Sequence, residues 1–162
     1  MPIVSDFKIT TLAKTNLTNN IMNNYPLLKF HFSVEWGGER IDFTEVTGLD
    51  LESEVIEYRH GAQADFTSMK IPGLKKYSNI TFKRGTFQGD SDFFQWYNTI
   101  HKDSFRRDIS IKLLNEEHEP VLSWSVKSAW PLKIQSTDLN ADANEVAIET
   151  MVIAHEGLTI QD

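Results

Sequence analysis

Residues 30–44 read FHFSVEWGGERIDFT, and this stretch decides the fold class. In its first half, apolar side chains alternate with polar ones, and the apolar set is Phe30, Phe32, Val34 and Trp36. A period of two is typical of a strand that buries one face. Gly37 and Gly38 tolerate the positive φ of a tight turn, so residues 40–44 are predicted to return as the second strand of a hairpin.

Strand-like patterns continue along the chain, in residues 51–59, 79–84, 108–114, 122–126 and 145–155. Residues 60–78, between two of these segments, are predicted to form a long connection. A connection of that length inside a compact domain is often functional. Together the segments predict a mainly β fold, an antiparallel sandwich or barrel of seven or eight strands.

One helix is predicted, over residues 91–102. Its apolar side chains lie at positions i, i+3, i+4 and i+7, namely Phe93, Trp96, Tyr97 and Ile100. This spacing places them on one helix face. A lone helix in a β protein normally buries such a face. We therefore interpret the four residues as the face through which a core helix packs on the sheet, rather than as a groove that binds a partner.

Composition excludes several classes of function. The 162 residues include no cysteine, which rules out disulfides, thiolate metal sites and cysteine nucleophiles. With 23 acidic and 16 basic residues the net charge is −7, which disfavours a binder of nucleic-acid backbones. No apolar run reaches the length of a signal peptide or membrane span, so we expect no stable membrane insertion and assembly in the cytoplasm.

Motifs for catalysis or cofactor binding give no positive support for an enzyme. The series Asp138, Asn140, Asp142 and Asn144, with Glu149 beyond it, has calcium-loop spacing. However, Ala143 replaces the required glycine and a strand-like segment follows, so a polar turn is the better interpretation. The five histidines form no close pair in the sequence, and Glu116, Glu117 and Glu119 are typical of an exposed hairpin tip. We therefore expect no metal and no cofactor.

Several segments, taken in order from Tyr25 to the C-terminus, resemble the tail-tube protein family of contractile phages and phage-tail-like contractile injection systems. The segments are Phe30–Trp36, FTEVTGL at 43–49, EYRHG at 57–61, KIPG at 70–73, NITFKRG at 79–85, AWP at 129–131, NEVAIE at 144–149 and HEGL at 155–158. Each is weak alone, but their shared order and spacing make the match specific.

The resemblance implies a structural subunit without enzymatic activity. It implies homo-hexameric rings in which strands join across subunits into a shared β-barrel, and rings that stack into a tube inside a sheath. The implied partners are the sheath, baseplate or tube-initiator proteins, and a protein or DNA cargo in the lumen. After cytoplasmic assembly the subunit would belong to a phage tail or an injection particle.

The resemblance also assigns candidate residues. The connection after the third strand would reach the neighbouring ring, through Arg59, Gly61, Lys70, Pro72 and Gly73. Ring-forming strands would carry Ile109, Ile111, Val146 and Ile148. Residues 1–25 are predicted to be an extended N-terminal arm before a tail-tube β domain at residues 26–162.

Three alternatives are kept open. The long arm would also suit a specialised initiator ring at the baseplate. A ligand- or carbohydrate-binding sandwich would need exposed aromatic side chains, for which Trp36, Trp124 and Trp130 are candidates. A metal-dependent enzyme would require a bound ion.

Overall fold

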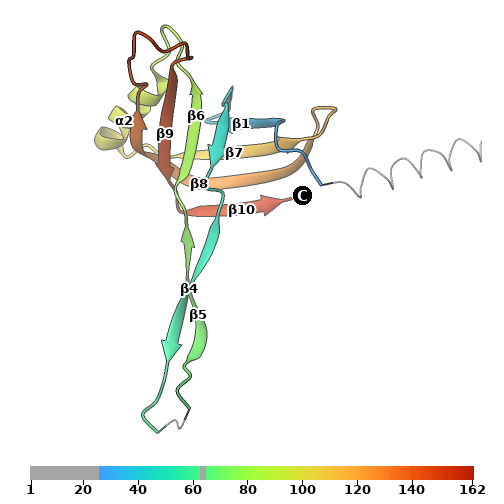
Figure 1. Ribbon diagram of the computed structural model, residues 1–162, viewed down its shortest axis with the longest axis vertical. Helices are drawn as coiled ribbons and strands as arrows, with labels where there is room; N and C mark the ends of the chain where they lie inside the picture. The colour runs from blue at the N-terminus through green and yellow to red at the C-terminus, as the bar shows by residue number, and fades with distance from the viewer. Residues whose placement is uncertain (1–25, 63–64) are drawn as a thin grey trace, which may run out of the picture.

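The computed structural model describes residues 26–62 and 65–162 (Figure 1). The elements in this part of the chain are β1 (Phe32–Trp36), β2 (Glu39–Ile41), β3 (Glu45–Thr47), β4 (Leu51–Tyr58), β5 (Met69–Tyr77), β6 (Ile80–Gly85), α2 (Asp92–Asp103), β7 (Arg107–Leu114), β8 (Pro120–Gln135), β9 (Ile148–Ala154) and β10 (Gly157–Gln161). Each strand pairs antiparallel with its neighbours. The predicted mainly β fold with one helix is therefore confirmed. The predicted arm, residues 1–25, lies outside the described residues.

The long strand β8 joins two groups of strands. The strand order is β2-β1-β7-β8-β9-β6-β3, and β10 also pairs with β8. The first half of β8 pairs with β7 and β10, whereas the half after Ala129 pairs with β9. Ser128, between the halves, has a left-handed φ of 52°. As a result, β6 and β9 run across the direction of β1, β7 and β10 (Figure 1).

The side chain of Asp108 on β7 stabilises the change of direction in β8. Its carboxylate accepts the Ser128 N–H at 2.9 Å and the Lys127 Nζ at 3.1 Å. The hydrogen bond from Ser128 is the main reason that the pKa of Asp108 is lowered, and Lys127 adds to the effect. The ionised carboxylate is therefore the form that stabilises this part of β8.

Replacing Asp108 by alanine is expected to lower the urea midpoint of unfolding at pH 7. Because the folded-state pKa is lowered, the carboxylate's contribution is present above the ordinary aspartate pKa of about 3.9 and is lost as pH falls through the folded value. The gap between wild type and Asp108→Ala should therefore close in acid. Lys127→Met keeps the Ser128 bond and should have a smaller effect. A gap that is unchanged at pH 2.5 would contradict this explanation.

The core lies where the two groups of strands and α2 meet. Its fully buried apolar residues are Val34, Trp36, Ile80, Phe82, Phe93, Trp96, Ile109, Ile111, Val126, Ala129, Met151, Ile153 and Leu158. The Trp36 ring lies at the centre, 4.9 Å from the Trp96 ring and 5.4 Å from the Phe93 ring. The helix therefore packs through Phe93 and Trp96, while Tyr97 and Ile100 are half-buried.

The predicted connection at residues 60–78 is wrong over about half of its length. β5 occupies Met69–Tyr77 and pairs with β4. This strand was not predicted because proline and glycine, here Pro72 and Gly73, both disfavour strand interiors. Both are tolerated here because β5 pairs only with β4, in a two-stranded sheet, and has a bulge at this position.

The predicted strand 145–155 begins later than expected. β9 starts at Ile148, and Val146 lies before it with 75% of its surface exposed. The reason is that Ile148 pairs with Gly85, the last residue of β6, so Val146 has no partner strand opposite it. Val146 is therefore not part of a strand in this structure, which corrects the predicted strand bounds, and its candidate role in ring formation stays a prediction.

Candidate assembly surface: the β4–β5 hairpin

The β4–β5 hairpin projects away from the rest of the subunit (Figure 1). Its two strands pair with each other and with no other strand in the described part of the chain. An isolated two-stranded hairpin is at best marginally stable in water, because it has no core of its own. The hairpin is thus the element of this fold that most needs a surface outside its own subunit.

The strand register divides the hairpin into two faces. Cross-strand partners lie on the same face, and the pairs Ile56 with Ile71 and Tyr58 with Met69 lie on one of them. We call these four residues the apolar face. Their exposed fractions are 53%, 45%, 53% and 55%, respectively. Four large apolar side chains therefore lie together on one face and are about half exposed.

The opposite face near the hairpin tip is mixed in character. It carries the pairs Val55 with Pro72 and Glu57 with Lys70. Closer to the body, the apolar face gives way to charge, since Lys76 Nζ lies 2.5 Å from Glu54 Oε1. The hydrogen bond and charge of Glu54 raise the pKa of Lys76. The apolar face is therefore bounded toward the body by an ion pair.

Two glycines allow the hairpin to form. Gly73 lies in the bulge, where a Cβ would come within 3.0 Å of the Glu54 carbonyl oxygen. Gly48 lies where the chain enters the hairpin, with φ +88°, and a Cβ there would lie 2.1 Å from the Asn79 carbonyl oxygen. Asn79 is where the chain leaves the hairpin. The entering and leaving strands are thus in direct backbone contact at the base.

A histidine from another part of the fold also contacts the base. The His155 ring follows β9 and lies 3.0 Å from the Ser78 carbonyl oxygen through Nε2. It also packs against the Tyr77 ring at a centroid distance of 5.4 Å. At the other end, the Arg59 guanidinium lies 5.8 Å from the Phe66 ring. The base is anchored to the body through His155, and the Arg59–Phe66 contact lies at the tip.

The structure brings the five candidate inter-ring residues together. Arg59 and Gly61 follow β4 at the tip, and Lys70, Pro72 and Gly73 lie on β5. The candidate ring-forming residues are placed differently. Ile109 and Ile111 are buried in the core on β7, and Ile148 begins β9. Both edges of β7 and of β9 are already paired within the subunit.

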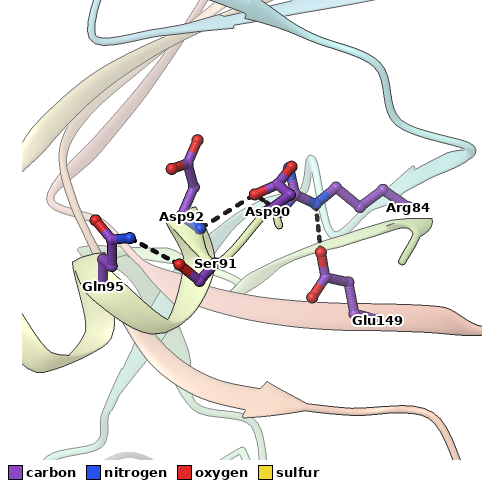
Figure 2. A network of polar contacts seen from close by, with 6 residues as sticks. All are labelled: Arg84, Asp90, Ser91, Asp92, Gln95 and Glu149. Carbon is purple, nitrogen blue, oxygen red and sulfur yellow. Dashed lines mark hydrogen bonds and ion pairs between the residues drawn. The ribbon is translucent and has the colours of Figure 1, made fainter. Parts of the chain in front are cut away.

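A buried charge network was not found from the sequence. Arg84 on β6 is 3% exposed and contacts two carboxylates, with Nε 2.5 Å from Glu149 Oε1 and the Nη atoms 2.9 and 3.0 Å from Asp90 (Figure 2). Asp90 also accepts the Asp92 N–H at the start of α2. Partial burial raises the pKa of Asp90, but the Asp92 and Arg84 bonds outweigh it, and the net shift is downward. The signal in the sequence was that Arg84 continues the every-second-residue series of Ile80 and Phe82, which places it on the buried face of β6.

The residues that were candidates for a metal site or a ligand site lie in several different environments. Glu149, the last position of the calcium-like motif, binds Arg84. Residues 26–62 and 65–162 contain no group of three or more potential ligands that could hold a metal ion, although the fold brings the His31 and His118 rings to 4.8 Å. Trp36 is 3% exposed, and Trp124 and Trp130 are half-buried. None of the described helices is long and apolar enough to span a membrane.

Comparison with known proteins identifies the family. Residues 28–159 match the model of the T4-like virus tail tube protein gp19 family. The chain belongs to this family. A comparison with curated protein sequences gave no match.

Solved structures of similar chains support this assignment. The tail tube protein is 32% identical to a chain of the PVC sheath–tube complex, an extracellular contractile injection system, over 89% of this chain and 97% of that one, with a TM-score of 0.81. It is 34% identical to a chain in the structure of the anti-feeding prophage cap, which terminates the tube, over 85% and 92% of the two chains, with a TM-score of 0.78. A type six secretion system protein shares the fold at 10% identity, over 81% and 82%, with a TM-score of 0.54.

Proposed function

We propose that this tail tube protein forms hexameric rings that stack into a hollow tube inside a contractile sheath. Sheath and baseplate proteins are its partners, and protein or DNA cargo occupies the lumen. Rings assemble in the cytoplasm before becoming part of a phage tail or injection particle. The solved relatives support this proposal, because they come from a sheath–tube complex and a tube cap. Its role is therefore mechanical rather than catalytic.

The uncovered apolar face of the hairpin carries the proposal. Ile56, Tyr58, Met69 and Ile71 lie on an element without a core, so their burial must come from outside the subunit. Burying the exposed half of each side chain contributes roughly 1 kcal/mol, and every subunit of a ring repeats the contact. We assign the apolar face to contact with a second copy of this chain in the adjacent ring. Arg59, Gly61, Lys70, Pro72 and Gly73 fix the shape and charge of the same hairpin.

Strand edges provide a route to ring closure. Among the described strands, β2, β3 and β10 each pair on one edge only. Unpaired edges readily add a strand from another chain. A closed ring removes such edges. Because β7 and β9 are paired on both edges within the subunit, they would contribute to a shared barrel without pairing across subunits.

Replacing Ile56 by glutamate is expected to abolish tubes while leaving rings intact. A charge on the apolar face cannot be buried against a second copy at acceptable cost. Negative-stain electron microscopy and mass photometry of the purified chain would distinguish tubes, rings and monomers. Val55→Glu is the matched control, because Val55 is adjacent, equally exposed and on the opposite face. Normal tubes from Ile56→Glu, or monomers in place of rings, would contradict the assignment.

A terminal ring is the second candidate function. It is favoured by the 34% identity to a chain in the structure of a tube-terminating cap. A terminal subunit should stop after one or two rings, whereas a main tube subunit should polymerise further. Tubes of many rings from the wild-type chain would exclude the terminal role.

A further inference from the structure

His155 places both of its ring nitrogens against carbonyl oxygens. Nε2 lies 3.0 Å from the Ser78 oxygen, at the exit of the hairpin, and Nδ1 lies 3.2 Å from the Gly157 oxygen, at the start of β10. A carbonyl oxygen can only accept a hydrogen bond. Both contacts are therefore satisfied only if both ring nitrogens carry a proton.

The protonation state of the His155 ring thus changes the number of hydrogen bonds that the ring can donate to the Ser78 and Gly157 carbonyl oxygens. A neutral imidazole has one N–H, so its other nitrogen presents a lone pair to a carbonyl oxygen. The imidazolium donates to both oxygens at once, and a charged donor makes the stronger bond. Histidine is the side chain whose charge ordinarily changes between about pH 5 and 8.

Other ionisable side chains also lie around this corner. Tyr77 on β5 packs its ring against the imidazole. Glu156, next in the chain, pairs with Arg106, and Lys127 on β8 pairs with Asp108. The Glu156 N–H also donates to the Lys127 carbonyl oxygen at 3.0 Å, which fixes the turn that carries the ring. Histidine is the one residue type among them whose charge ordinarily changes between about pH 5 and 8.

We infer that His155 is a proton-dependent latch that ties the base of the β4–β5 hairpin to the β9–β10 turn. In the protonated state the ring bridges Ser78 and Gly157 and holds the hairpin at a fixed angle to the body. Loss of the proton removes one of the two bonds and loosens the base. The consequence for assembly rests on the proposed function, since the latch would orient the apolar face for the adjacent ring.

Amide hydrogen exchange of the full chain as an isolated subunit tests the latch. After correction for intrinsic exchange rates, residues 77–80 of the wild type should be about tenfold better protected at pH 5.5 than at pH 7.5, the effect of one charged hydrogen bond. His155→Gln should give equal protection at both values. His60→Gln, at the exposed hairpin tip, should retain the wild-type response. A wild type without this response, or a pH response retained by His155→Gln, would overturn the inference.

Nitrogen NMR of the wild-type imidazole gives a second readout that needs no variant. At pH 5.5 both His155 nitrogens should show bonded protons and slow exchange with water, and rapid exchange at either nitrogen would refute the bridge. Both measurements use subunits rather than tubes. If Ile56→Glu assembles normally while His155 behaves as expected, the stacking proposal fails and the latch stands.

Discussion

Gly48→Ala is expected to lower the free energy of unfolding of the isolated subunit by about 4 kcal/mol or more, the range of severe single substitutions. The added Cβ would lie 2.1 Å from the Asn79 carbonyl oxygen, where no side-chain movement can relieve the clash. The backbone would have to separate the two strands at the hairpin base. Urea unfolding measures the stability, and electron microscopy should show that tubes are lost.

Gly38→Ala is the matched control for this prediction. Gly38 has φ +90°, close to the +88° of Gly48, but a Cβ there has nothing within 4 Å. Its cost should be the backbone cost of a left-handed alanine, about 1–2 kcal/mol. The difference between the variants isolates the clash with Asn79. Equal losses would show that the left-handed conformation alone makes Gly48 necessary.

Arg84→Met should destabilise the subunit by about 3–5 kcal/mol, the usual effect of removing one partner from a buried ion pair. The variant leaves Glu149 and Asp90 without their cation and removes the guanidinium that lies 3.8 Å from the Phe93 ring. Because Asp90 also accepts the N–H of Asp92, the first residue of α2, helix and sheet should loosen together. Urea unfolding followed by far-UV circular dichroism at pH 7 measures the loss.

Lys83→Met provides the comparison on the same strand. Lys83 is adjacent to Arg84 but pairs with Glu45 on the more exposed face, so its removal should cost no more than about 1 kcal/mol. The Arg84 effect should also shrink in acid. The pKa of Asp90 is lowered, so its contribution is present above about pH 3.9 and is lost as pH falls through the folded value. Equal effects of the two substitutions would contradict a structural role for the network.

These predictions concern two regions that serve assembly differently. The Arg84 network joins β6, β9 and the start of α2 in the body of the subunit (Figure 2). Gly48 and His155 act at the junction between that body and the hairpin. Removing the Arg84 network or replacing Gly48 should therefore lower every assembly state, whereas loosening the junction through His155 should affect stacking first.

The elements that were predicted correctly from the sequence are those whose apolar side chains are buried within their own subunit. Phe32, Val34 and Trp36 alternate because β1 has one face on the core. Phe93 and Trp96 follow the helical period because α2 packs on the same core. A local period records burial directly, so the mainly β class and the single helix followed from residue order alone.

The hairpin and the charge network needed the tertiary structure, for two physical reasons. β5 has no buried face within the subunit, its residues alternate only at Met69–Ile71, and Pro72 and Gly73 suggested a loop. Arg84 and Glu149 are 65 positions apart, and His155 and Ser78 are 77 apart, so only the paired sheets bring them together. Residue order was enough to show which segments bury apolar surface, whereas only the folded chain shows which distant polar groups meet and which apolar face stays exposed.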